Sequence, residues 1–170
     1  MPAAENTKQS VLIVHGCTSN RTEGMRYAKA IINAGFNLLA KDPRIKAGVF
    51  SGSYANSMEV LADQIKPIFG LPHYLLIPMV SQLFAWRGNL DIHEINPEKY
   101  IAQISPRPVY IMHGTADKTV EFKHGLRLFE AANEPKQFWR AENGEHTELW
   151  QLDNEKAESS VVTFFNRYLK

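Results

Sequence analysis

The sequence predicts one α/β domain, a three-layer sandwich with a mostly parallel sheet of about four strands and flanking helices. Short apolar runs rich in β-forming residues recur along the chain, and helical patterns separate them, as in strands joined by crossover helices. Residues 11–14 are entirely apolar, and the run at 109–113 is largely apolar and rich in β-forming residues, which is typical of strands covered on both faces. A length of 170 residues suits one domain, 1–170, with a proper core.

Composition excludes several classes of function. A hydrophobic content of 44% and a formal net charge of +1 describe an ordinary globular protein. No basic run or aromatic-interleaved basic patch indicates a nucleic-acid partner. Cys17 is the single cysteine, so neither an internal disulfide nor a thiolate metal site is expected. The scattered histidines show no ligand-like grouping, and we expect no metal or cofactor. The first ten residues lack the apolar core of a signal peptide, so the expected location is cytoplasmic.

The first third of the chain predicts a strand at 11–15, a helix over about 22–41 and a second strand at 45–50. The segment Gly35-Phe36-Asn37-Leu38-Leu39 is ambiguous, because a helix could end at the glycine and an outer strand begin. Such a strand would leave only residues 41–44 before the strand at 45–50, whereas a parallel crossover needs about a dozen residues. One long helix is therefore predicted, and an antiparallel hairpin is the alternative.

The middle of the chain predicts a helical cap within about 58–104. A helical pattern begins at Met58, and Pro67 is expected to break or kink it. The stretch 68–86 is strongly apolar, but Pro72, His73 and Pro78 make a membrane span improbable. A cap over the carboxyl edge of the sheet explains the same apolar stretch. A short helix at 98–104 follows it.

The last third places an acid and a histidine after two successive strands. The strand at 108–113 is followed by Gly114, expected to free the backbone for a turn, and by Asp117. A helix at 121–132 leads to a strand at 136–141, after which comes His146, and a helix at 156–169 ends the chain. Parallel strands end at one edge of a sheet, so Asp117 and His146 should meet there. A carboxylate in hydrogen-bond contact orients an imidazole as a general base.

These motifs resemble a known family. Val11-Leu-Ile-Val-His15-Gly16, His113-Gly-Thr-Ala-Asp117 and Gly144-Glu-His146 are similar to segments of the α/β-hydrolase superfamily, in its esterase- and peptidase-like branch. The resemblance implies that Asp117 is the acid and His146 the histidine of a catalytic triad. It also implies an oxyanion-hole amide at Cys17 and a small acyl ester or amide as substrate.

One part of the family pattern is absent. The nucleophile elbow, Gly-x-Ser-x-Gly, does not occur in the 170 residues, and Gly52-Ser53-Tyr54 and the loop at 16–20 do not fit it. Residues 41–49 resemble the family segment that follows the nucleophile helix, so the elbow and its strand are expected to be missing. The fold is therefore predicted to be a reduced α/β-hydrolase-like sandwich with a truncated triad.

Simpler interpretations remain open beside the triad. Asp117 could close a turn through its side chain, and His146 could begin a helix without a chemical role. Cys17 could be a thiol nucleophile near a helix start. Three functions follow: a hydrolase with a substitute nucleophile, a non-catalytic remnant, or a flavodoxin-like binding module. The lack of a glycine-rich phosphate loop counts against the third. Lost strands and an apolar cap also predict a homodimer.

Overall fold

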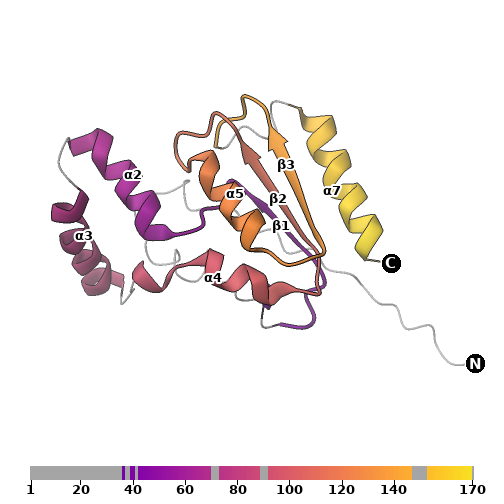
Figure 1. Cartoon of the computed structure of the whole chain (residues 1–170), viewed down its shortest axis with the longest axis horizontal. Coiled ribbons are helices and arrows are strands. Elements are labelled where there is room, and N and C mark those ends of the chain that lie inside the picture. Colours follow the sequence, from indigo (N-terminus) through magenta and orange to yellow (C-terminus); the bar gives the residue numbers. More distant parts are fainter. Residues whose placement is uncertain are drawn as a thin grey trace, which may run out of the picture.

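The computed structural model describes residues 36, 39–40, 42–69, 73–88, 92–146 and 153–169 (Figure 1). Its described sheet is parallel and has the order β1–β2–β3. The strands are β1 (Gly48–Ser51), β2 (Val109–Gly114) and β3 (Lys136–Ala141). Gly48 pairs with Val109, and Val109 pairs with Lys136, so the carboxyl ends of all three strands lie side by side.

The helices lie along and beside this sheet (Figure 1). The α-helices whose bounds the structure describes are α2 (Ser57–Phe69), α3 (His73–Gly88), α4 (Pro97–Ile101), α5 (Phe122–Ala131) and α7 (Asn154–Tyr168). Two 3-10 turns, η1 (Ile92–Glu94) and η2 (Ala102–Ile104), lie before and after α4. None of the described helices combines the length and apolar character that a membrane crossing requires.

Strand β2 is buried along its whole length and separates two apolar cores. Val109 and Ile111 pack with Leu128 of α5 on one face. Tyr110 and Met112 pack with Phe164 of α7 on the other. Alternate side chains of a strand point to opposite faces, so this division places helices on both sides of the sheet. The predicted α/β fold with flanking helices is confirmed in the described part of the chain.

Three of the four predicted strands are present. β2 and β3 match their predicted ranges within one residue, and β1 begins three residues later than expected. The delay has a local cause, because the turn at Asp42 continues to Ile45, whose N–H donates to the Asp42 carbonyl at 3.2 Å. The predicted strand at 11–15 lies outside the described residues.

The ambiguous segment at 35–39 is helical where the structure describes it. Phe36, Leu39 and Ala40 have helical conformation and do not pair with the sheet. Phe36 stacks on Phe50 of β1 with ring centroids 4.0 Å apart, which places the end of this helix on the sheet. The crossover argument is therefore confirmed at these positions, and the rest of the predicted helix at 22–41 lies outside the described residues.

Pro67 was expected to break or kink helix α2, and of these two expectations the break is wrong. Helix α2 continues two residues past this proline to Phe69. A proline lacks an N–H and removes the hydrogen bond to the residue four positions earlier, here the Asp63 carbonyl. Because Pro67 lies in the last turn, few helical bonds follow it, and the helix ends before a second turn is affected.

Candidate active site

Asp117 lies in the loop that follows β2, with its side chain fully buried. Its Oδ1 accepts hydrogen bonds from the backbone N–H groups of Thr119 at 2.9 Å and Val120 at 2.8 Å. The carboxylate therefore closes its own loop, as the simpler interpretation of this residue expected. The second oxygen, Oδ2, is left for other partners.

His146 lies in the loop that follows β3 and brings its ring to that second oxygen. Nδ1 of His146 is 2.8 Å from Oδ2 of Asp117, and the imidazole side chain is 21% exposed. Since a carboxylate can only accept, Nδ1 carries the proton of this bond. The predicted meeting of these two side chains is confirmed, at a distance within the usual hydrogen-bond range of roughly 2.6–3.2 Å. In the neutral ring, Nε2 is then the nitrogen without a proton.

The two loops are bound to each other by their backbones. The N–H of Thr115 donates to the Ala141 carbonyl, and that of Ala116 donates to the Gly144 carbonyl, both at 3.0 Å. The N–H of Asn143 donates to Oγ1 of Thr115 at 2.8 Å. These bonds fix the acid loop against the histidine loop, so the distance between Asp117 and His146 is set by the fold.

Gly114 has a different role from the one its sequence position predicted. It belongs to β2, and its backbone is not in the left-handed region. A Cβ at this position would collide with the backbone of Gly144. Gly114 is therefore required for the close approach of the two loops, and the turn itself begins only at Thr115.

The surroundings of Asp117 keep it ionised. Burial alone would raise its pKa, but hydrogen bonds from His113, His146 and the Val120 N–H outweigh burial and hold the pKa well below its usual range. An ionised carboxylate can stabilise positive charge that develops on the His146 ring when Nε2 takes up a proton.

Gly52 packs against the His146 ring. The sequence motifs did not identify this contact. It follows β1 with φ of +57°, and its N–H donates to the Met112 carbonyl at 2.9 Å. A Cβ there would lie 3.2 Å from Nδ1 of His146. Both the left-handed backbone and the nearby ring favour glycine. The available signal was a glycine placed directly after a strand.

Nε2 of His146 forms no hydrogen bond with any residue in the described ranges. Cys17, the expected oxyanion-hole position, lies outside the described residues, as does Ser19. The structure therefore brings together the predicted acid and histidine, while the oxyanion and nucleophile positions stay predictions.

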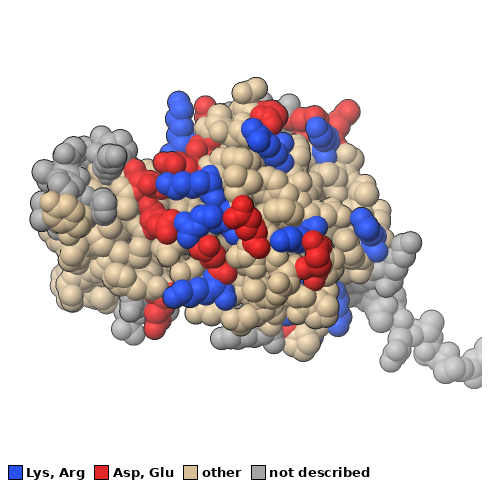
Figure 2. Space-filling model, viewed as in Figure 1, with Lys and Arg blue, Asp and Glu red and all other residues tan. Residues whose placement is uncertain are grey.

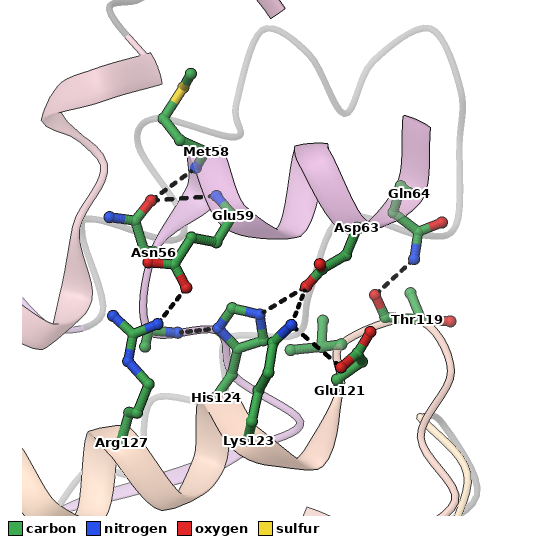
Figure 3. A network of polar contacts seen from close by, with 12 residues as sticks. Asn56, Met58, Glu59, Asp63, Gln64, Thr119, Glu121, Lys123, His124 and Arg127 are labelled. Carbon is green, nitrogen blue, oxygen red and sulfur yellow. Dashed lines mark hydrogen bonds and ion pairs between the residues drawn. The ribbon is translucent and has the colours of Figure 1, made fainter. Parts of the chain in front are cut away.

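Polar contacts connect α2 to the acid loop and to α5 (Figure 3). Gln64 of α2 donates through Nε2 to the Thr119 carbonyl at 2.7 Å. Lys123 contacts Oδ2 of Asp63 at 2.7 Å, and Arg127 pairs with Glu59 of α2. Arg127 also pairs with Glu98 of α4. These contacts hold α2 against the acid loop and against α5, and they hold α5 against α4.

His124 is the buried member of this network (Figure 3). Its Nδ1 accepts a hydrogen bond from the Ala55 N–H at 3.4 Å, so the neutral ring carries its proton on Nε2, 3.5 Å from Oδ2 of Asp63. Burial lowers the pKa of His124, although Asp63 opposes this effect. His124 therefore serves the contact between α2 and α5.

Sequence comparison finds distant relatives, some of which align with only a short segment of this chain. No protein-family model matches the chain. The uncharacterized protein YfhR of Escherichia coli K12 is 33% identical over 72 residues, which cover 42% of this chain and 25% of that protein. The uncharacterized protein YqkD of Bacillus subtilis 168 is 20% identical over 224 residues, covering 96% of this chain and 73% of YqkD.

Solved structures give a clearer result for the fold. The Pyrococcus furiosus esterase Pf2001 superposes with a TM-score of 0.61 at 21% identity, over 79% of this chain and 50% of the esterase. An esterase domain from Rhodothermus marinus gives 0.58 at 16% identity, over 83% and 58% of the two chains. The Pyrococcus horikoshii acylaminoacyl peptidase gives 0.57 at 17%, over 81% and 23%. The chain has an α/β-hydrolase-like fold.

This α/β-hydrolase-like chain is short beside the proteins that it matches. It spans about half of the Pyrococcus furiosus esterase and about a quarter of YfhR. The alignment with YqkD covers 224 positions, and the chain has 170 residues, so at least 54 of those positions have no residue here (224 less 170). The α/β-hydrolase-like fold is thus present in a reduced form.

Proposed function

We propose that this chain is a reduced relative of ester and amide hydrolases that keeps the acid and histidine of a triad and lacks the serine. The observation that carries the proposal is the 2.8 Å contact between Nδ1 of His146 and Oδ2 of Asp117 in a chain without Gly-x-Ser-x-Gly. The positions of YqkD that have no residue here support the loss of a segment. Acyl transfer is then weak or absent.

The remaining pair can still do limited chemistry. Asp117 orients His146, and Nε2 can take a proton from water or attack an activated acyl carbon directly. A triad hydrolase that loses its serine loses on the order of 10⁶-fold in turnover. The substrate class we propose is therefore a small acyl ester or amide, with measurable turnover for activated aryl esters only.

Further proposals concern the rest of the molecule. We infer that the helical region at about 58–104 acts as a cap, that the chain is a cytoplasmic homodimer, and that the Cys17 amide contributes to an oxyanion hole. The main competitor is a hydrolase that has recruited Cys17, Ser19 or Ser53 as nucleophile. A non-catalytic dimeric binding module is the other alternative.

Hydrolysis of p-nitrophenyl acetate tests the proposed chemistry. We expect slow turnover that falls a few-fold in His146→Ala, because the oriented imidazole is lost. The exposed His93 provides a matched control, and His93→Ala should leave the rate unchanged. Ser19→Ala, Ser53→Ala and Cys17→Ala should also have no effect.

Two outcomes would overturn the proposal. One is turnover at ordinary enzyme rates that a single serine or cysteine replacement abolishes, since this would reveal a substitute nucleophile. The other is covalent labelling by a fluorophosphonate, located by peptide mass mapping at Cys17, Ser19 or Ser53. A rate unaffected by His146→Ala would instead exclude the imidazole as the reacting group.

A further inference from the structure

His113 is a fully buried histidine in β2, four residues before the acid. Its Nε2 is 2.8 Å from the Val120 carbonyl oxygen and 3.3 Å from Oδ2 of Asp117. Both neighbours of Nε2 are acceptors, so this nitrogen carries a proton and donates toward them. The ring therefore contacts the same carboxylate oxygen that binds His146.

Val120 closes a small ring of contacts around the acid. Its N–H donates to Oδ1 of Asp117 at 2.8 Å, while its carbonyl accepts from His113. Oδ1 is then held by two backbone N–H groups, and Oδ2 lies between two imidazoles. Both oxygens of the carboxylate are therefore held in position. Among the described residues, the ion pairs and hydrogen bonds of Oδ2 involve the side chains of His113 and His146.

Helix α5 holds the His113 ring in place. A Cβ on Gly125 would lie 2.6 Å from Nδ1 and 2.7 Å from Cγ of His113, so only glycine admits the ring here. Phe122 contacts the ring edge-on, with centroids 5.9 Å apart. Nδ1 has no hydrogen-bond partner in the described part of the chain. An unpaired buried polar atom is costly, so packing alone would favour an apolar residue at this position.

We propose that His113 is a positioning residue, whose Nε2–H holds the Asp117 carboxylate so that Oδ2 faces His146. The role of this contact in catalysis rests on the proposed function, whereas its effect on the carboxylate can be measured without any substrate. His113 acts through Asp117 and touches no reacting atom.

Carboxyl titration of Asp117 by ¹³C NMR tests the proposal in the full chain. Glutamine at 113 can place an amide N–H near the position of Nε2, whereas the shorter asparagine cannot reach Asp117. We expect His113→Asn to raise the proton affinity of Asp117 about tenfold or more, because a donor to a buried carboxylate is lost. His113→Gln should remain close to wild type. The low-field proton of His146 Nδ1 should shift in the asparagine variant and be restored in the glutamine variant.

The outcomes separate this inference from the proposed function. Equal Asp117 titration in wild type, His113→Asn and His113→Gln would overturn the positioning role. If His113→Asn does not fold, Gly125→Ala takes its place, because its Cβ displaces the ring and should raise the proton affinity of Asp117 in the same direction. An unchanged titration in Gly125→Ala would equally overturn the role. Turnover of the wild type at ordinary enzyme rates would contradict only the proposed function, because the Asp117 titration is measured without substrate.

Discussion

Asp117 links the stability of the acid loop to its chemistry. Its carboxylate accepts from two backbone N–H groups and from His146, so the same charge that orients the imidazole also closes the loop. The pKa of Asp117 in the folded protein is held below the usual range. The ionised carboxylate therefore stabilises the fold at pH values above the ordinary aspartate pKa near 4, and this stabilisation is lost as the pH falls below that value.

We therefore expect acidification from pH 5 to 2.5 to destabilise wild type more steeply than Asp117→Asn. Asparagine keeps an acceptor oxygen for the backbone N–H groups of Thr119 and Val120 but cannot titrate. Urea unfolding at several pH values measures the difference, and all other carboxylates are common to both proteins. If the free energy of unfolding fell equally with pH in both proteins, the role given to this carboxylate would be contradicted.

The acid and the histidine could be predicted from sequence because each follows a strand within a short motif. Gly52 and His113 could not, since their roles arise from contacts with residues distant in the chain. Gly52 lies 94 positions before the ring that it faces (146 less 52). For His113, the sequence indicates a buried position but not the carboxylate beside Nε2. Local patterns predict which residues are at the site, and packing decides what surrounds them.

Gly52→Ala tests the packing of Gly52 against the imidazole. A side chain in the left-handed region costs about 1–2 kcal/mol, and the new Cβ would also press on the His146 ring. We expect a loss of unfolding free energy of about that size in urea, together with a shifted Nδ1–H signal of His146. The neighbouring Ser53→Ala is the control and should change neither quantity. A Gly52→Ala protein as stable as wild type would contradict this account.

At the scale of elements, the position of β2 was predictable because it is a short, largely apolar run between turn residues, whereas β3 is only partly apolar. The segment at 35–39 was resolved by geometry, since a parallel crossover cannot be made in four residues. The mutual placement of α2, α4 and α5 was not predictable. It depends on charged pairs such as Arg127 with Glu59 and Glu98, which join positions about 30 to 70 residues apart.

The α2–α5 contact should make stability depend on pH through His124. Burial lowers the pKa of His124 in the folded protein. The unfolded chain therefore binds a proton at this histidine near pH 6.5, whereas the folded protein binds it only at lower pH. Stability should therefore fall as the pH is lowered from 7.5 to 5.5. His124→Asn keeps an acceptor for the Ala55 N–H but does not titrate. Its free energy of unfolding should therefore fall less over this pH range than that of the wild type. Equal losses in both proteins would contradict the prediction.

Arg107 joins the helix before β1 to the start of β2. Its guanidinium donates to the carbonyls of Ala40 at 2.8 Å and Asp42 at 2.9 Å. We expect Arg107→Ala to cost about 2 kcal/mol of unfolding free energy, because two carbonyls lose their donor. Arg44→Ala is the matched control, since the side chain of Arg44 is 88% exposed. Similar losses in both variants would contradict this role.

At the scale of the whole molecule, the surface over α5 and α2 differs from that of α3. Figure 2 shows Lys, Arg, Asp and Glu side by side over the region of α5 and α2. Helix α3, in contrast, exposes large apolar side chains, with Met79 63%, Leu83 43% and Trp86 77% exposed. These three positions recur at four and three residues, so they lie along one side of the helix. An apolar stripe of this kind is typical of an interaction surface.

A second copy of the chain is the partner that we expect on this stripe. The stripe carries no charge among its three residues, so two copies of α3 can face each other across a two-fold axis without placing like charges together. Light scattering at micromolar protein should then give twice the chain mass of 19.3 kDa. Met79→Glu and Trp86→Glu should each shift the mass toward the monomer, because a buried unpaired carboxylate opposes association. Val162→Glu is the matched control, since Val162 is 49% exposed on α7. A wild-type mass of 19.3 kDa, or equal dissociation by all three variants, would rule out α3 as the dimer contact.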